Sequence, residues 1–491
     1  MDNKLANGYK WSLINVSSKT IAQVAYTAVI SRLLNANIFG VIAMATLVIN
    51  FGNYFAKLGL GPAIIQKNEI NNEEKNAAFT SATLLGLFVT VLVFISAPLV
   101  GGFFDSLAVV NVIRVLSISF FINGLSTAPI SLLSRELCFK KIALIEILAY
   151  IIGNIVIGIS LAFIGFGEWS LVFATLSQQL IITLLSLSLV KYKFKFTFNK
   201  DSYKELYSYG LKSTVNNIAD YFIVNTDKIF IGKMDSIFLG QYNRISSIII
   251  IPFEQITISL SRVFFPQISK LQNDKIELKK VYKKYYSLFA TILMSLGFGA
   301  IASTSNVIRV VLGSQWVGIN NIFIVVVLFG VFYYLTHFNA VLCDALGKLK
   351  SKLKIQIINL IIILILSLIV FKLGAFAILI IMLISKFINF IVYSTNTKII
   401  LGYSSREYLM MHFYIIRSSL IVFLLITCFN YIANIYNIDV FMFLFYQLCL
   451  GVIGLAIGVY ILPNNGVKCI VIDIMKKLQK HILRKVNKNE E

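Results

Sequence analysis

The stretch AAFTSATLLGLFVTVLVFISAPLVGGFF, residues 77–104, decides the fold class because it contains no charged residue. Bilayer hydrocarbon is about 30 Å thick, so a spanning helix needs about 20 mostly apolar residues. The composition extends this pattern to the whole chain, in which 58% of the 491 residues are hydrophobic and 13% are charged. Such stretches are too long and too uniformly apolar for barrel strands, so we expect an all-α, polytopic membrane protein with about 14 transmembrane helices. The expected spans are roughly 9–32, 37–60, 77–104, 108–133, 142–165, 168–191, 206–232, 238–264, 281–303, 320–346, 351–374, 375–398, 411–433 and 438–462.

The positive charges outside these spans fall almost wholly on one side of the membrane. The gaps after odd-numbered spans hold only Arg32, Lys233, Arg309 and Lys372, whereas the gaps after even-numbered spans and the two ends hold most of the others. Cytoplasmic loops collect Lys and Arg, so we expect both termini to be cytoplasmic and the number of spans to be even. The net charge of +22 therefore indicates contact with membrane lipids at the inner surface and disfavours a nucleic-acid partner.

The basic segment KYKFKFTFNKDSYKE, residues 191–205, divides the chain into two similar halves. Each half opens with a span that contains several polar residues, followed by a tight external turn. A bulky residue and a glycine come next, Phe39-Gly40 in the first half and Leu239-Gly240 in the second. Since both halves start inside and contain six spans, we expect parallel repeats related by an axis along the membrane normal, an arrangement found in transporters. The expected domains are an N-terminal lobe (1–191), a cytoplasmic basic linker (192–205), a C-terminal lobe (206–398), two further spans (399–466) and a basic amphipathic cytoplasmic tail (467–491).

Ionisable and amide side chains inside the spans are the candidate functional residues, because a charge in hydrocarbon costs at least about 2.5–3.5 kcal/mol. Span seven is the richest, since Lys212, Asn216, Asp220 and Asp227 share one helical face and Lys228 adjoins it. The candidate cavity-lining or substrate-binding residues are Lys19, Asn53, Lys212, Asn216, Asp220, Lys228, Arg244 and Lys386. The alternatives for the deeper lysines and Asp220 are structural ion pairs or misplaced spans.

Depth along the spans suggests one specific pair. Span seven runs outward and span eight runs back, so Asp227 and Arg244 come to similar depth. The two form either a structural ion pair or, with Asp220, a site for ion coupling. Cationic groups outnumber acidic ones inside the spans, and a cavity lined in this way suits an anionic cargo such as a pyrophosphate or an acidic sugar.

Catalytic and cofactor motifs are not evident in the sequence. The five cysteines form no metal-like spacing, and the three histidines, His337, His412 and His481, form no metal set. No GxxxxGK[ST] loop for nucleotide hydrolysis occurs, and no Ser/His/Asp arrangement is suggested. We therefore expect no cofactor, no bound metal and no enzymatic activity.

Six stretches resemble one known family: SRLLNANIFGVIAMATL (31–47), LGLGPAIIQ (58–66), SRELCFKK (134–141), NTDKIFIG (225–232), LGQYNRI (239–245) and LSRVFFPQISKLQ (260–272). They are similar to the bacterial polysaccharide transporters, in the branch that looks like colanic acid exporters, within the multidrug/oligosaccharidyl-lipid/polysaccharide exporter superfamily. The resemblance implies a two-bundle fold that turns undecaprenyl-pyrophosphate-linked oligosaccharides from the inner to the outer leaflet of the cytoplasmic (inner) membrane. It also implies transport that is driven by an ion gradient. It makes Asp227 and Arg262 family-like positions, with a role in either packing or transport.

The leading hypothesis is a flippase for lipid-linked oligosaccharide that works by alternating access. Its expected partners are this substrate, membrane lipids, and the polysaccharide polymerase and export machinery. One alternative is a small-molecule or drug exporter of the same superfamily, for which an acidic cavity would be expected. The other is a membrane polysaccharide polymerase, which usually needs a sizeable extramembrane loop with catalytic groups.

Overall fold

The computed structural model describes residues 2–67, 69–190, 192, 194–197, 218, 221–222, 224–433 and 439–461, without the side chains of residues 2–17, 66, 262–263 and 349–350. Within these ranges the chain is helical and contains no strand. The longer helices are α1 (Asp2–Leu33), α2 (Ala36–Lys57), α4 (Asn72–Phe104), α5 (Leu107–Arg135), α6 (Phe139–Tyr150), α8 (Glu168–Leu189), α10 (Ser236–Lys270), α11 (Lys275–Ala302), α13 (Asn320–Ala345), α14 (Leu349–Val370), α15 (Ala375–Leu401), α16 (Ser405–Ala433) and α17 (Val440–Ile461). The short elements are α3 (Leu60–Gln66), a π-helix η1 (Ile151–Gly158), α7 (Ile159–Phe163), α12 (Thr304–Val307), and η2 to η4 (Ile308–Leu312, Ser314–Trp316 and Phe371–Leu373).

Twelve helices among the described residues are long and apolar enough to cross a membrane. They coincide with twelve of the expected spans, which confirms the all-α, polytopic membrane fold. The expected span 9–32 falls on α1, and residues 224–234 form the helical end of the expected span 206–232. The total of 14 spans stays a prediction, because most of residues 206–223 lie outside the described part.

Polar residues in the connecting turns fix where these helices begin. Asn71 caps α4 in a capping box, in which its side chain accepts from the Glu74 amide (2.8 Å) and Glu74 accepts from the Asn71 amide (3.1 Å). Asn35 caps α2, and Asp274 caps α11. These caps satisfy amides that have no partner within the helix, so the chain can turn sharply between adjacent spans.

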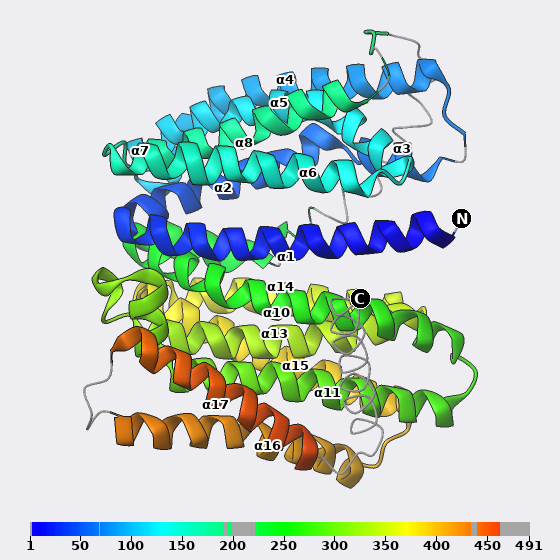
Figure 1. Cartoon of the computed structure of the whole chain (residues 1–491), viewed down its shortest axis with the longest axis vertical. Coiled ribbons are helices and arrows are strands. Elements are labelled where there is room, and N and C mark those ends of the chain that lie inside the picture. The colour runs from blue at the N-terminus through cyan, green and yellow to red at the C-terminus, as the bar shows by residue number, and fades with distance from the viewer. Residues whose placement is uncertain are drawn as a thin grey trace, which may run out of the picture. The chain divides into compact units, whose positions relative to one another are not determined.

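The first compact unit comprises Met1–Arg244 and Ser367–Ile378. In it α5 packs against α2, α4 and α8, and α1 packs against α6 (Figure 1). The start of α10 belongs to this unit because it packs on α2, and residues 367–378 belong to it through the ring contacts of Phe371 with Phe230 and of Phe376 with Phe238. The domain boundaries expected from the sequence stay predictions, since this division follows the contacts of α10 rather than the basic linker.

The second unit comprises Ile245–Leu366 and Leu379–Glu491, of which residues 434–438 and 462–491 lie outside the described part. Here α11 packs against α13, α16 and α17 around buried aromatic rings. At one end Lys279 pairs with Glu407 (2.6 Å) and lies over the ring of Tyr403, and burial raises the pKa of Tyr403. The expected amphipathic tail, 467–491, is not tested.

The described part of the basic linker packs on the start of α4. Phe194 stacks on Phe79 with ring centroids 4.6 Å apart, and the Tyr192 hydroxyl donates to the Asn72 carbonyl (3.0 Å). The alternation of aromatic and basic residues predicts side chains in the lipid headgroup layer. At Phe194 the aromatic side chain contacts the protein instead, which anchors this segment to the first unit.

Candidate functional site

The structure describes five of the eight candidate cavity residues: Lys19, Asn53, Lys228, Arg244 and Lys386. Lys212, Asn216 and Asp220 lie outside the described residues, as does the side chain of Arg262. The first four described residues belong to the first unit and Lys386 belongs to the second, so each group is considered by itself.

Two pairs of side chains, an ion pair and an aromatic ring pair, join α1 to α6 inside the first unit. Lys19 Nζ lies 3.3 Å from Glu146 Oε2, and both side chains are partly exposed, at 41% and 32%. Seven residues further along α1, the Tyr26 ring meets the Tyr150 ring edge-on at 6.1 Å. Spacings of seven on α1 and of four on α6 keep each set on one helical face. The sequence indicated Lys19, but it gave no sign that Glu146, far away along the chain, is its counterion.

Arg244, on the first turns of α10, lies close to the Tyr26–Tyr150 ring pair. Its guanidinium carbon lies 3.9 Å from the centroid of the buried Phe39 ring, a cation–π contact. The hydroxyls of Tyr26 and Tyr150 are within electrostatic range of the same guanidinium. Lys19 and Glu146 join α1 to α6, and Arg244 approaches the same two helices about two turns further along α1. We name Lys19, Glu146, Tyr26, Tyr150 and Arg244 together the basic cluster.

Asp227 and Lys228 have partners close by in the chain. Asp227, which is 4% exposed, accepts a hydrogen bond from the Tyr242 hydroxyl on α10. Lys228 Nζ lies 3.5 Å from Asn225 Oδ1, on the same helical segment. Asp227 thus lies against Tyr242 while Arg244 lies over Phe39, and the expected Asp227–Arg244 pair stays a prediction.

Asn53 belongs to a polar stripe along α2. Its amide nitrogen donates to the Ile49 carbonyl (3.0 Å), which is ordinary back-bonding within the helix. Thr46, Asn50, Asn53 and Lys57 recur at spacings of four, three and four, so they share one face of α2. We name this face the α2 polar stripe.

Lys386 is a buried cation among the described residues of the second unit. The residue is 6% exposed, and its Nζ lies 5.3 Å and 5.5 Å from the ring centroids of Phe329 and Tyr333 on α13. The aromatic faces stabilise the ammonium where water is scarce. Among the described residues no group of His, Cys, Asp and Glu could hold a metal ion.

The helices α2 and α10 cross at two glycines near their first turns. A Cβ added to Gly40 would lie 1.9 Å from the Ser236 carbonyl oxygen, and one added to Gly240 would lie 1.9 Å from the Ala36 carbonyl oxygen. Only glycine permits backbones to approach so closely. The Ser236 hydroxyl also donates to Asn37 Oδ1 (2.8 Å). We name this contact the glycine crossing.

The glycine crossing is built from equivalent residues of the two expected repeats. Ala36 corresponds to Ser236 and Gly40 to Gly240, with residue numbers that differ by 200 in both pairs. The caps correspond as well, since Asn35 accepts from the Ile38 amide (3.1 Å) and Asp235 accepts from the Phe238 amide (2.9 Å). The short likeness between the two opening turns therefore marks a local two-fold relation. The loop charges predict that this end faces outward.

The Lys19–Glu146 pair gives a test of whether Lys19 acts beyond the fold. We expect Glu146→Gln to lower the protein level, because it leaves an ammonium in the span at a cost of up to about 2.5–3.5 kcal/mol. The reversed pair Lys19→Glu/Glu146→Lys keeps the attraction, so we expect it to restore the protein level, measured by immunoblot, but not transport. If the reversed pair supports normal transport, the pair is structural only.

A comparison with solved structures identifies the fold of this protein. A solved structure described as the inward-facing conformation of a multidrug resistance MATE family transporter of the MOP superfamily matches with a TM-score of 0.58 at 17% identity, over 79% of this chain and 96% of that one. At this identity the likeness shows the fold alone. The protein is therefore an all-helical, multi-span membrane protein with a MATE-like fold.

The family follows from the sequence match. The polysaccharide biosynthesis protein family matches residues 29–321, more than half of the chain, and the chain belongs to this family. One relative is the teichuronic acid biosynthesis protein TuaB of Bacillus subtilis, 23% identical over 70% of this chain and 72% of its own length. Another is the lipopolysaccharide biosynthesis protein WzxC of Escherichia coli, 23% identical over 64% of each chain. These matches confirm the resemblance to polysaccharide transporters.

Proposed function

We propose that this protein is a flippase that moves undecaprenyl-pyrophosphate-linked oligosaccharide from the inner to the outer leaflet of the cytoplasmic membrane. The observation that supports the proposal is the basic cluster, with Lys19 on the expected span 9–32 and Arg244 on α10, in a member of the polysaccharide biosynthesis family. Charges are kept within membrane spans at a cost, and they commonly mark substrate or ion pathways. Cationic donors suit the diphosphate of such a substrate.

The proposed cycle is alternating access with both termini in the cytoplasm. The glycine crossing holds the outer ends of α2 and α10 together, and release of cargo outward requires these ends to separate. Asp227, buried against Tyr242, and Asp220 are the carboxylates proposed to couple an ion gradient to this movement. The movement itself makes and breaks no covalent bond, so the protein needs no enzymatic activity.

The MATE-like fold keeps a small-molecule or drug exporter as the second candidate. The two functions differ in cargo, which a lipid analysis resolves. We expect deletion of the gene to cause accumulation of undecaprenyl-pyrophosphate oligosaccharide that stays on the cytoplasmic leaflet, and the wild-type gene to reverse this accumulation. The measurement is mass spectrometry of extracted lipids, combined with protection of the glycan from an added glycosidase.

Two outcomes of the deletion contradict the proposal. Unchanged lipid-linked glycans with altered drug sensitivity would assign the chain to small-molecule export. Single repeat units displayed on the outer leaflet without elongation would point to a defect in polymerisation, because the flipping step would then be intact.

A further inference from the structure

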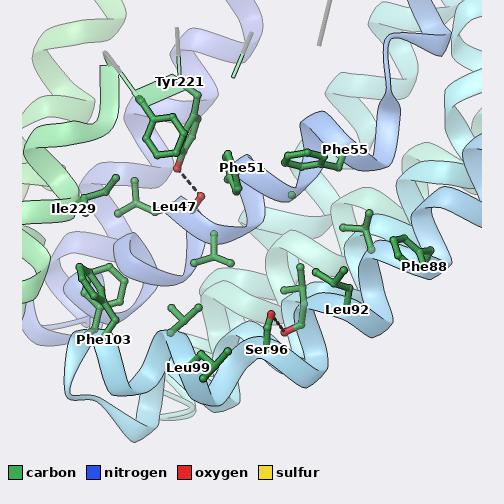
Figure 2. Close-up of a pocket in the computed structure, with 17 residues that line it drawn as sticks. Leu47, Phe51, Phe55, Phe88, Leu92, Ser96, Leu99, Phe103, Tyr221 and Ile229 are labelled. Carbon is green, nitrogen blue, oxygen red and sulfur yellow. Dashed lines mark hydrogen bonds between the residues drawn. The ribbon is translucent and has the colours of Figure 1, made fainter. Parts of the chain in front are cut away.

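A long apolar groove runs along the first unit, with a volume of about 620 Å³. Its walls are α2, α4 and the residues Tyr221, Phe222 and Ile229, and Figure 2 shows Phe51, Leu92 and Tyr221 lining it. On α4 the lining runs from Phe88 to Phe104, a length of about 24 Å at 1.5 Å per residue. The groove lies within the size range of small-molecule sites, about 300–1,000 Å³, and its length suits a chain-like ligand.

The groove offers nothing to a polar ligand. Its lining contains two side-chain hydroxyls, and each is already bonded to a wall helix: Tyr221 donates to the Leu47 carbonyl (2.5 Å) and Ser96 to the Val93 carbonyl (3.3 Å) (Figure 2). The other lining residues are apolar or glycine. A headgroup in this groove would lose its hydration and find only two hydroxyl oxygens, whose protons are already donated to the wall helices, so the lining suits a hydrocarbon chain.

The walls are unusually rich in aromatic rings. Seven lining residues are aromatic: Phe51, Phe55, Phe88, Phe103, Phe104, Tyr221 and Phe222. Several contact one another, as Phe51 does with Phe55 (5.2 Å) and Tyr221 (5.5 Å). Broad, stiff ring faces offer a large apolar contact area, and a polyprenyl chain, with a planar double bond and a methyl branch in every unit, can pack closely against them.

The position of the groove links it to the candidate site. Its α2 wall carries Leu47, Val48, Phe51 and Phe55, and the α2 polar stripe lies on the reverse face of the same helix. One helix thus presents hydrocarbon to one side and amides with a lysine to the other. That division matches a substrate with an apolar tail and a polar, anionic head.

We propose that this groove binds the isoprenoid tail of the lipid carrier while the glycan is moved. The inference rests on the proposed function and extends it, because it gives the tail a protein site rather than leaving it in bulk lipid. The tail then stays on α2 and α4 while the head crosses, which keeps the cargo attached to the transporter throughout the cycle.

The test uses purified protein in phosphatidylglycerol nanodiscs with a polyprenyl phosphate that carries a photoreactive group midway along its chain. We expect labelling of groove residues such as Leu92 and Leu99, mapped by peptide mass spectrometry. Excess unlabelled polyprenyl phosphate should abolish this labelling, and added phosphatidylglycerol should not. Equal competition by phosphatidylglycerol, or labelling spread evenly over exposed residues, would mean ordinary boundary lipid and would overturn the proposal.

A matched pair of variants tests the groove in cells. Ser96→Trp places a bulky ring in the groove, and Ile95→Trp places the same ring on the preceding residue, which is 71% exposed and outside the lining. We expect about a tenfold loss of labelling and of glycan export for Ser96→Trp, and less than a twofold change for Ile95→Trp. Loss of labelling with normal export would overturn the groove proposal and leave the flippase assignment standing. Groove labelling in a protein that moves no lipid-linked glycan would overturn the flippase assignment alone.

Discussion

Oxidation of an Asn37→Cys/Ser236→Cys variant is expected to stop glycan export, and a reductant is expected to restore it. In the structure the Ser236 hydroxyl donates to Asn37 Oδ1 across 2.8 Å, so the two side chains face each other and cysteines at these positions are placed to be cross-linked. The bond would fix the start of α2 to the start of α10. If the outer ends must separate to release cargo, export falls to the level of the deletion strain. Surface glycan is measured before and after oxidation.

Single variants are the controls for this experiment. Asn37→Cys and Ser236→Cys alone should keep export under oxidant, which excludes an effect of the native cysteines. A mobility shift on a non-reducing gel after cleavage between the two positions confirms the cross-link. Full export by the cross-linked protein would show that α2 and α10 stay together throughout the cycle, and the proposed movement would then be wrong.

The sequence predicts the helices well because burial in lipid imposes one simple pattern. The uncharged stretch 77–104 lies in α4, and the polar turn before Phe39-Gly40 contains the Asn35 cap of α2. The paired turns at Gly40 and Gly240 were recognisable as a repeat, although nothing in the sequence alone shows that they touch. Repetition predicts similar local structure, while contact depends on how the repeats are arranged.

The partners of the charged residues could not be predicted from the sequence. Lys19 pairs with Glu146, which is 127 positions away in the sequence, and the Arg244 guanidinium lies over the Phe39 ring. A cation over an aromatic ring leaves no charge pattern along the chain. The groove cannot be predicted from the sequence for a similar reason. A membrane span requires apolar residues everywhere, so the sequence does not distinguish Leu92, which lines the groove, from Ile95, which does not.

Replacement of Gly240 by valine is expected to open the glycine crossing. The new Cβ would lie 1.9 Å from the Ala36 carbonyl oxygen and 2.8 Å from the Gly40 amide nitrogen. Both atoms belong to backbone, so no side-chain rotation relieves the clash and the two helices must move apart. An overpacking cost of about 3 kcal/mol reduces the population of the closed crossing more than about a hundredfold. We expect export to be nearly lost, while a cysteine at position 236 reacts faster with a membrane-impermeant thiol reagent added from outside.

Gly102→Val is the matched control, because a Cβ at Gly102 has no atom within 4 Å and the residue lies in α4 of the same unit. We expect this variant to change stability by less than about 0.5 kcal/mol and to export normally. The repeat leads to a further expectation. A Cβ at position 40 would lie 1.9 Å from the Ser236 carbonyl oxygen, so Gly40→Val should reproduce the Gly240→Val defect. A strong defect in one variant with none in the other would show that the two glycines are not equivalent, since a symmetric clash must separate the helices from either side.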